Sequence, residues 1–357
     1  MTNDPRLPKL PFNYFQRAGY NFFQVLDHFI TRRITVKLFG KLRYMLFLNM
    51  VKSLKAKGKG KLIPIERRDD LSVKEFYDYY VKKGIPVVFN GAAKNWDCVK
   101  KWSLEYFKEL HGNDEVPIID SENFENGVEF TTLSDLIGQI RKGNFKAYFR
   151  FYNLLTRHPE HINDFDLKWL KAHRHKRAYF ESFQVFIGGE NSMTDIHNSH
   201  IANLFVQVFG EKHWVLYPFH QLPFIDPPPT DNGIFRNAPA RVNGKQFKSF
   251  APDFEAYPYF EYLDGYTVKL KPGDVFYNPP YMWHTVKNIT DSIGVGFRWA
   301  NVWHSFRSSP TYYLLDLMAF RPNYFTSIKK VTKDANQQFI DRFEKMKKMG
   351  LAYKKVY

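Results

Sequence analysis

Two histidines of this chain stand in contexts that are typical of metal ligands held on β-strands. His197 lies in the segment 194–200, directly ahead of an apolar stretch that closes at Gly210. His284 follows a Pro-Gly-Asp turn at 272–274 and a short apolar run. Because neutral imidazole nitrogens bind first-row transition metals, two such residues on neighbouring strands would form part of a metal site. The sequence therefore predicts a site assembled from segments that are far apart in the chain.

These histidines need a framework of strands, and the sequence after residue 183 predicts one. Short apolar runs are separated by Gly, Pro and Asn, which is the pattern of a β-sandwich or barrel. Segment 218–258 contains Pro227-Pro-Pro229 and predicts a long loop over one mouth of the barrel. The predicted strands cover residues 183–188, 202–209, 212–217, 266–270, 274–277, 284–288 and 292–299.

Helices are predicted on both sides of this framework. Segment 12–57 has apolar residues at helical spacing with Lys and Arg between them, which predicts a basic amphipathic helical region. Such a region would lie on an anionic membrane, on a partner or on the protein's own body. Ser72 and Glu75 predict a capping box at a helix start, and 332–350 predicts a C-terminal helix with one apolar face.

The chain divides into three predicted regions. Residues 1–61 form a basic helical extension that ends in a linker, where alternating Lys and Gly at 55–61 predict flexibility. Residues 62–305 form the folded body that carries the histidines. Residues 306–357 form a basic helical segment at the C-terminus.

The net charge of +16 is concentrated at the two ends of the chain. Residues 1–70 hold 15 Lys and Arg against 5 Asp and Glu, and residues 321–357 hold 10 against 3. The stretch between them is nearly neutral. The ends therefore predict contact with an anionic membrane surface or an acidic partner, whereas the body argues against nucleic acid in the site.

The composition excludes several classes of protein. With 44% hydrophobic and 18% aromatic residues the chain can bury a large core, so it is no small disulfide-stapled scaffold. Cys98 is the single cysteine, which suits a reducing compartment, and we expect a cytoplasmic protein. The first ten residues do not resemble a secretory signal, and the apolar run 44–51 is too short to span a bilayer.

Three stretches together resemble the JmjC-like, cupin-8 group of Fe(II)/2-oxoglutarate oxygenases: 194–210, the return strand 211–218, and 271–284. Segment 84–96 is also similar to that group, and the resemblance spans about 65–305. It implies a mainly β fold with flanking helices, in which a double-stranded β-helix (cupin or jelly-roll) core has helical N- and C-terminal extensions. It also implies Fe(II) and 2-oxoglutarate as cofactors, and a homodimer formed through C-terminal helices.

The resemblance assigns roles to individual residues. His197 and His284 match the two metal-binding histidines of the family. Lys212 matches the lysine that pairs with the far carboxylate of 2-oxoglutarate, which is a charge-assisted contact. Thr194 and Asn203 match positions that hydrogen-bond this cosubstrate.

Three further positions extend this set. Tyr148 matches a tyrosine on an earlier strand, and Gly296 falls where the family usually has Asn. A glycine there leaves space beside the metal. Arg298 lies two residues later on the same strand face and would grip a carboxylate with its two terminal nitrogens. A surface arginine on a barrel strand explains Arg298 equally well.

Ser199 departs from the family, which has Asp or Glu two residues after the first histidine. A serine hydroxyl is a neutral and weak Fe(II) ligand, so the two-histidine-one-carboxylate site is incomplete. In one interpretation chloride fills the open position and the enzyme halogenates its substrate. In a second, a hydroxylase recruits Asp195 or His200 as the third ligand. In a third, the site is degenerate and the barrel is a non-catalytic binding protein. Both catalytic interpretations oxidise an unactivated C–H bond in a small-molecule or peptide substrate.

Overall fold

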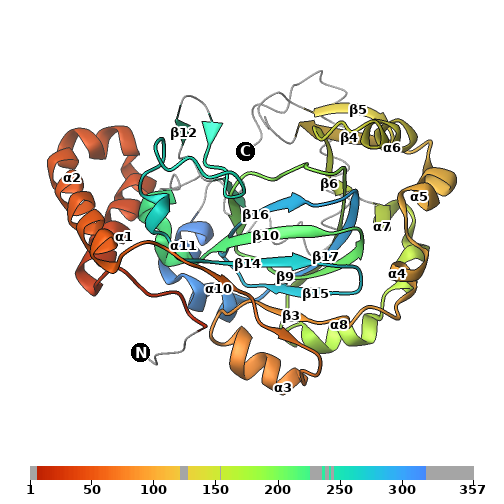
Figure 1. Ribbon diagram of the computed structural model, residues 1–357. Helices are drawn as coiled ribbons and strands as arrows, with labels where there is room; N and C mark the ends of the chain where they lie inside the picture. Colours follow the sequence, from red (N-terminus) through yellow and green to blue (C-terminus); the bar gives the residue numbers. More distant parts are fainter. Residues whose placement is uncertain are drawn as a thin grey trace.

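Two β-sheets face each other and form the body of the protein (Figure 1). The computed structural model describes residues 6–120, 128–152, 154–225, 235–237, 241–242 and 245–318. The smaller sheet has six strands in the order β1-β14-β10-β16-β8-β11, and the larger has nine in the order β2-β3-β15-β9-β17-β7-β6-β4-β5. Most neighbouring strands are antiparallel, with β1–β14 and β2–β3 as parallel pairs. This is the jelly-roll-like core that the sequence predicted.

All strands predicted after residue 183 are present, each with its ends within three residues of the expected positions. The smaller sheet contains β1 (Leu62–Pro64), β8 (His197–Ser199), β10 (Lys212–Tyr217), β11 (Phe235–Asn237), β14 (Gly265–Leu270) and β16 (Trp283–Asn288). The larger contains β2 (Arg67–Arg68), β3 (Val87–Phe89), β4 (Glu115–Asp120), β5 (Val128–Thr132), β6 (Ala147–Tyr152), β7 (Phe180–Gly188), β9 (Ala202–Phe209), β15 (Val275–Asn278) and β17 (Ser292–Ala300).

Short helices cover the larger sheet and its ends. Ser72 and Glu75 form the predicted capping box at the start of the first of them. The predicted loop 218–258 contains short elements where it is described, among them the pair β12 (Arg241–Val242) and β13 (Lys245–Gln246). The helices of the body are α3 (Val73–Glu75), the π-helix η1 (Phe76–Val81), α4 (Asp97–Lys101), α5 (Leu104–His111), α6 (Leu133–Arg141), α7 (Leu154–Arg157), the 3-10 helix η3 (Pro159–Asp164), α8 (Leu167–His173), the 3-10 helix η4 (Phe219–Gln221), α9 (Leu222–Ile225), the 3-10 helix η5 (Phe260–Tyr262), α10 (Val302–Ser308) and α11 (Pro310–Leu317).

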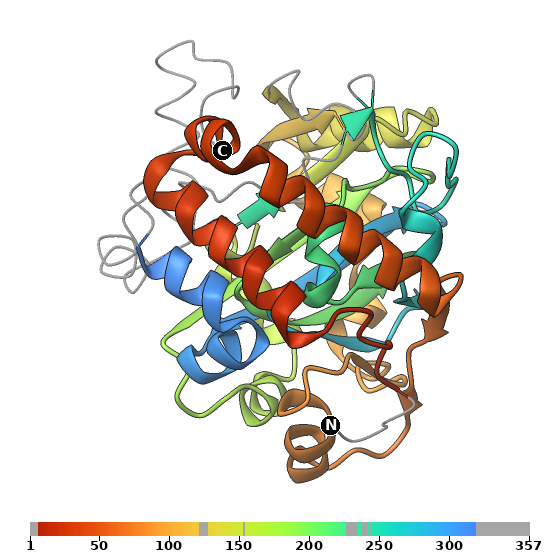
Figure 2. The same ribbon diagram turned by 90° about the vertical axis from the view of Figure 1, so that its left-hand side faces the viewer.

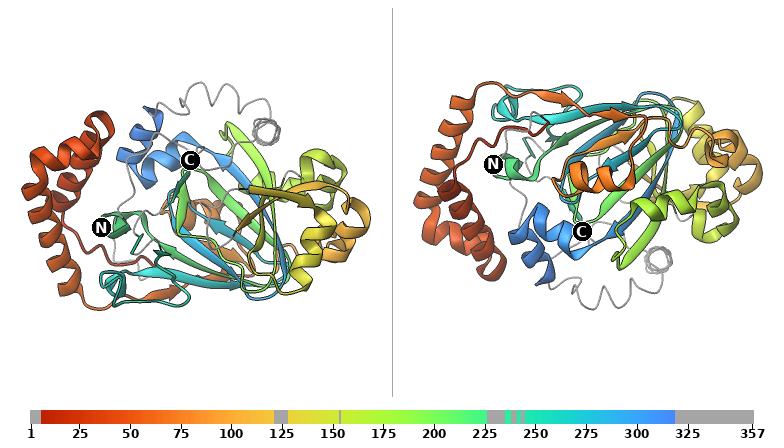
Figure 3. Two further views of the ribbon diagram at one scale, coloured as in Figure 1. Left: turned by 90° about the horizontal axis from the view of Figure 1, so that it is seen from above. Right: turned by 90° about the horizontal axis from the view of Figure 1, so that it is seen from below.

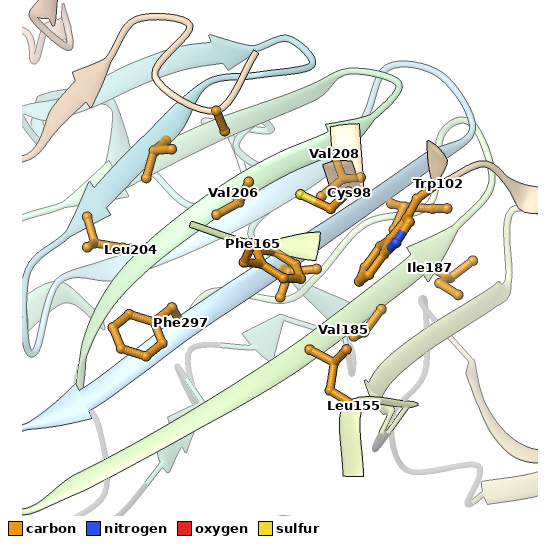
Figure 4. Packing of buried hydrophobic residues seen from close by; sticks show 14 of the residues in the cluster. Cys98, Trp102, Leu155, Phe165, Val185, Ile187, Leu204, Val206, Val208 and Phe297 are labelled. Carbon is orange, nitrogen blue, oxygen red and sulfur yellow. The ribbon is translucent and has the colours of Figure 1, made fainter. Parts of the chain in front are cut away.

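A large apolar core fills the space between the nine-stranded sheet and its helices. Figure 4 shows Cys98 and Trp102 lying over Val206, Val208 and Ile187 of the sheet. Burial raises the pKa of the Cys98 thiol to about 12, so this cysteine is a packing residue rather than a reactive one. The strands β9 and β17 are buried along almost their whole length because helices cover one face and the second sheet covers the other.

The N-terminal segment is helical, as predicted, and folds into a hairpin of α1 (Tyr14–Ile30) and α2 (Arg32–Lys57). Figure 2 looks onto this hairpin, which lies across one end of the barrel, and Figure 3 shows α5 and α6 at the opposite end. The inner face of the hairpin packs against the body through aromatic contacts, such as that of Phe47 with Phe224 and Tyr259. The hairpin and the barrel therefore share one apolar cluster.

A buried carboxylate holds the hairpin turn together. The chain reverses at Thr31, whose φ of 83° is left-handed. Asp27 accepts hydrogen bonds from Arg43 at 2.6 and 2.9 Å and from Arg32 at 2.9 Å, and it also contacts the Thr35 hydroxyl. Burial raises the pKa of Asp27, but the hydrogen bonds from Arg43, Thr35 and Arg32 outweigh it and lower the pKa. Asp27 is therefore ionised at neutral pH and organises the cations around it.

The predicted flexible linker at 55–61 is wrong. Helix α2 continues to Lys57, whose ammonium pairs with Asp264 at 2.8 Å. The Lys59 ammonium pairs with Glu261 at 2.5 Å, and the backbone of Lys61 donates to Asp264 at 2.9 Å. Carboxylates that are distant in sequence thus neutralise the lysine run and fix it beside β14, so the like charges no longer keep it extended and mobile.

The predicted C-terminal helix 332–350 lies outside the described residues. Before it, α10 and α11 pack beside the hairpin, and the His28 imidazole of α1 lies 3.4 Å from the Met318 carbonyl oxygen. Within the described part of the chain, no helix combines the length and the apolar character that are needed to cross a bilayer.

Candidate metal and cosubstrate site

The two predicted metal ligands meet across the smaller sheet. His197 of β8 and His284 of β16 are direct partners in an antiparallel pair, and their ring centroids lie 4.2 Å apart. Nδ1 of His197 lies 2.6 Å from the Asp195 carbonyl oxygen, and Nδ1 of His284 lies 2.9 Å from that of Met282. A carbonyl only accepts, so each Nδ1 carries the proton and each Nε2 carries the lone pair. The backbone thereby sets both imidazoles in the tautomer that binds a metal through Nε2.

The turn before β16 fixes the orientation of His284. Tyr281 has a left-handed φ of 61°, and its backbone N–H donates to the Ser199 carbonyl at 2.7 Å. Its phenol donates to the buried Asp316 carboxylate at 2.5 Å. On the strand side, the Trp214 indole stacks on the His284 ring at 5.4 Å between centroids. Contacts from the turn, from β8 and from β10 therefore hold this imidazole.

The histidines open into a cavity between the two sheets, with about 640 Å³ of space that atoms do not fill, part of it open to solvent. The smaller sheet contributes the two candidate metal-binding histidines and a lysine, and the larger sheet contributes aromatic, amide and guanidinium groups. No Asp or Glu occurs among the described residues that line it. The lining consists of Tyr148, Phe186, Thr194, His197, Ser199, Ile201, Asn203, Phe205, Lys212, Trp214, Asn278, His284, Val286 and Arg298.

Lys212 is the principal charge of the cavity. Its side chain is 1% exposed, and Nζ donates to the Asn288 amide oxygen at 2.5 Å and lies 5.8 Å from the ring centre of Tyr148. Burial lowers the pKa of Lys212 to about 7. Gly294 on the facing strand makes room for it, because a Cβ there would lie 3.2 Å from Cε of Lys212 and 2.2 Å from the Phe205 ring. The fold thus buries an amine that is only about half protonated at neutral pH, and an anionic ligand would stabilise its charged form.

Arg298 is a second cation facing the cavity, as one of the two sequence interpretations held. Burial lowers the pKa of the Arg298 guanidinium to about 10. The residue as a whole is half-buried. Nη1 donates to the Gln184 amide oxygen at 2.6 Å.

Gly296, which was expected to leave space beside the metal, instead gives space to Asn203, whose Oδ1 would lie 2.9 Å from an added Cβ.

Several polar atoms of the lining have no hydrogen-bond partner within the described chain. They are Oδ1 of Asn203, Oδ1 of Asn278, Nε1 of Trp214 and Nε of Arg298. Buried polar groups are almost always satisfied, and an orphan group costs about 1–3 kcal/mol. A concentration of such atoms around one cavity indicates a site built for a polar ligand.

Thr194 and Ser199 line the cavity, but each hydroxyl also has a structural bond. The Thr194 hydroxyl accepts from the backbone of Val286 at 2.9 Å, which ties the loop before β8 to β16. The Ser199 hydroxyl accepts from the backbone of Ile201 at 3.3 Å. Ser199 is 6% exposed and lies two residues from His197 on the same strand.

Neither alternative third ligand lies among the cavity residues. The Asp195 carboxylate is 3.4 Å from the Lys248 ammonium, and its backbone oxygen serves the His197 ring. The His200 ring is buried with its centroid 6.5 Å from that of Tyr281. Asp195 lies two residues before His197, the spacing that puts two side chains on one face of a strand, but β8 begins only at His197, so this alternation does not extend back to residue 195.

A second group of imidazoles lies outside the cavity, where α5 meets η3. His111, Glu160 and His161 bring ligand-type atoms within 4.8 Å of one another. The Nε2 atoms of His111 and His161 are 2.8 Å apart, and the His158 ring stacks on His111. Two nitrogens on one tetrahedral ion would lie about 3.3 Å apart. The two rings are therefore joined by a hydrogen bond, and we assign no part of the reaction to this group.

Sequence reasoning missed Asn278 and Asn288, which contact His284 and Lys212. Side-chain alternation along β16 was an available signal, because His284, Val286 and Asn288 share one strand face. Trp214 was identifiable in the same way, two residues after Lys212.

The facing sheets and the paired histidines define a cupin-like protein. The cupin-like domain family matches residues 73–307, more than half of the chain, and the chain belongs to this family. It is 26% identical to a lysine-specific demethylase of Arabidopsis thaliana over 66% of this chain and 55% of the relative. It is 24% identical to a bifunctional peptidase and (3S)-lysyl hydroxylase of Homo sapiens over 62% of this chain and 79% of the relative. It is 31% identical to HSPB1-associated protein 1 of Homo sapiens over 57% and 45%. The chain spans about half the length of most curated relatives that it matches.

Proposed function

We propose that this protein is an Fe(II)- and 2-oxoglutarate-dependent oxygenase that oxidises an unactivated C–H bond. The observation that carries the proposal is Lys212, a fully buried amine in the same cavity as His197 and His284, where the described lining residues include no carboxylate. A buried charge is stable only beside a counter-charge or with its hydrogen bonds satisfied. A dicarboxylate cosubstrate meets that requirement, and membership of the cupin-like family supports it.

The residues of the cavity fit the two cofactors in part. His197 and His284 would hold Fe(II) through Nε2, and Lys212 would pair with one carboxylate of 2-oxoglutarate. Once bound, Fe(II) and 2-oxoglutarate supply the oxidising power for C–H cleavage. The Asn203 amide, which lines the cavity, would donate an N–H to an oxygen of the cosubstrate, while the Trp214 indole stacks on the His284 ring. The part that does not fit is Ser199, which offers no negative charge to the metal.

A second outcome of the same chemistry, halogenation, is favoured by one specific observation. Ser199 occupies the carboxylate position, and the described lining supplies cations but no anion. Chloride at the position beside Ser199 would offset part of the positive charge of the metal, Lys212 and Arg298. We therefore propose that chloride is a ligand of this site, with hydroxylation as the alternative outcome.

The substrate is proposed from the same charges. The demethylase and the lysyl hydroxylase among the relatives carry names that refer to lysine. In this chain, Lys212 and Arg298 would repel a lysine ammonium at the cavity. We propose a neutral or anionic small molecule or peptide segment instead. The single, buried Cys98 supports a reducing, cytoplasmic setting.

An anaerobic titration tests the proposal. Fe(II) and 2-oxoglutarate together should give a visible metal-to-ligand charge-transfer band, and oxygen should then yield succinate. His197→Ala should abolish the band, and Lys212→Met should give it only at a higher concentration of 2-oxoglutarate. His213→Ala and Lys269→Met are matched controls, because His213 turns to the other face of β10 and Lys269 is exposed on β14. If the wild-type protein gives neither band nor succinate, the barrel is a binding protein and the proposal is wrong.

Ser199→Asp separates the two outcomes. Chloride added in place of nitrate should shift the band of the wild-type protein, because the halide enters the coordination sphere. The variant should bind Fe(II) more tightly and lose the response to chloride, since its own carboxylate then fills the position. A wild-type band that is indifferent to chloride would remove the halide from the proposal and leave hydroxylation.

A further inference from the structure

The outer face of the α1–α2 hairpin exposes many large apolar side chains. More than half of the exposed large hydrophobic residues in the described chain fall within residues 14–48. Phe15, Phe22 and Phe29 are spaced seven residues apart on α1 and are 81%, 56% and 55% exposed. Leu38 of α2 is 66% exposed. Isolated exposed hydrophobic residues are ordinary, but a concentration of them on one pair of helices indicates an interaction surface. We call the exposed apolar residues of 14–48 the hairpin face.

Basic side chains accompany the hairpin face without acidic ones. Arg33, Lys37 and Lys41 follow one another along α2 at four-residue spacing and are all exposed. Asp27 is the single carboxylate of residues 14–57, and it is buried in the turn, where Arg43 and Arg32 neutralise it. The hairpin therefore presents apolar and cationic groups together, and its ionisable surface is of one sign.

We propose that the hairpin docks on an anionic lipid bilayer. Its apolar side chains would enter the boundary between headgroups and acyl chains, while Arg33, Lys37 and Lys41 remain at the level of the lipid phosphates. The described helices are not suited to span a membrane, so the contact is with the surface. A second copy of the chain fits the hairpin face poorly, because two such faces would bring like charges together. An anionic bilayer satisfies both the apolar and the cationic groups.

The rest of the fold makes this docking consequential for the site. The inner face of the hairpin buries Met50 and Leu54 in the same apolar cluster as Ile196, Tyr281 and Trp283. Ile196 directly precedes His197, and Tyr281 and Trp283 lie within three residues of His284. A membrane that holds the hairpin therefore holds the barrel with it, because the hairpin and the barrel share this cluster.

Vesicle sedimentation tests the inference with the full chain. The protein should pellet with vesicles of phosphatidylcholine and phosphatidylserine and remain largely in solution with phosphatidylcholine alone. Substituting Arg33, Lys37 and Lys41 together by Gln should weaken binding to the anionic vesicles roughly 100-fold, since each surface cation contributes substantially to attraction. High salt should weaken wild-type binding in the same direction because it screens the charges.

A second triple variant tests the apolar part. Substituting Phe15, Phe22 and Phe29 together by Ser should reduce binding at least about tenfold, even at low salt. The matched control substitutes Leu110 and Phe254, two exposed apolar residues outside the hairpin, by Ser and should bind like the wild type. Retention of the Fe(II)/2-oxoglutarate band, or of the circular dichroism spectrum if that band is absent, shows that each variant is folded.

Three results would overturn the docking. The first is equal binding of the wild-type protein to neutral and anionic vesicles, and the second is vesicle binding that neither triple variant weakens. The third is a wild-type protein that does not bind vesicles but forms a dimer in solution, which the Phe-to-Ser triple variant dissociates. The last result would assign the hairpin face to a second copy of the chain. Binding of the control variant that falls as far as that of the Phe-to-Ser triple would likewise reject a specific role for the hairpin.

Discussion

Raising the pH above neutrality should release 2-oxoglutarate from this protein through a single side chain. Burial lowers the pKa of Lys212 to about 7, far below the ordinary lysine value of 10.5. A carboxylate binds the protonated ammonium, so the free protein must hold that proton before the cosubstrate can pair with it. Above pH 7 the ammonium of the free protein loses its proton, and each bound cosubstrate then requires a proton to be taken up.

The size of the effect follows from that linkage. If only the protonated form binds, affinity for 2-oxoglutarate should fall roughly fiftyfold between pH 7 and pH 9. Lys212→Met removes the charge while keeping much of the packing. This variant should bind 2-oxoglutarate roughly 10- to 100-fold more weakly at neutral pH, as expected for the loss of a charged hydrogen bond, and its affinity should not vary over the same pH range.

Anaerobic isothermal titration of the Fe(II)-loaded protein with 2-oxoglutarate measures both quantities. Buffers of different ionisation enthalpy report the proton uptake directly, which should approach one per molecule bound above pH 8. Lys269→Met serves as the control, because this exposed lysine lies on a neighbouring strand. A wild-type affinity that stays constant within about twofold, or a Lys212→Met variant that keeps the wild-type slope, would refute the reasoning.

Three further variants test other parts of the structure by urea unfolding. Lys212→Met should stabilise the protein without ligand by at most about 5 kcal/mol, since a lowered lysine pKa penalises the folded state fully below pH 7. The gain should shrink as the pH rises and vanish above about pH 11, where this lysine is neutral in both the folded and the unfolded state. Gly294→Ala should cost about 1–3 kcal/mol because its Cβ would meet Phe205, and it should also weaken 2-oxoglutarate binding. Asp27→Asn should loosen the hairpin by roughly 3 kcal/mol, visible as faster hydrogen exchange in α1, while the charge-transfer band of the site is unchanged. Equal stability of wild type and variant would contradict each prediction.

The strands of the core could be predicted because their signal is local. Apolar runs of strand length between Gly, Pro and Asn locate β9 and β10 at the predicted bounds. Lys212 and His284 then fall on strands whose alternation turns both side chains into the cavity. A positive charge on an inward-facing strand position is a strong signal, since it is tolerated only where something binds it.

The features that sequence reasoning missed depend on contacts between distant segments. The lysine run at 55–61 reads as a mobile linker until Asp264 and Glu261 are brought beside it by β14. The role of Asp195 also changed, because its backbone oxygen and not its carboxylate serves His197. The partners of the lysine run are not encoded by local pattern, because β14 must first be placed beside the run. Asp195 and His197 are only two residues apart, and here the missed feature was that β8 begins at His197.

The register of β8 against β16 has a consequence for how this site can change over evolutionary time. The spacing of His197 and His284 is set by strand pairing and by backbone carbonyls, and the Ser199 side chain takes no part in either. Residue 199 can therefore be exchanged without moving the histidines. A lineage could gain or lose the metal carboxylate by a single substitution while keeping a stable fold. The residue that would select the reaction can therefore change without a change in the fold that positions the histidines.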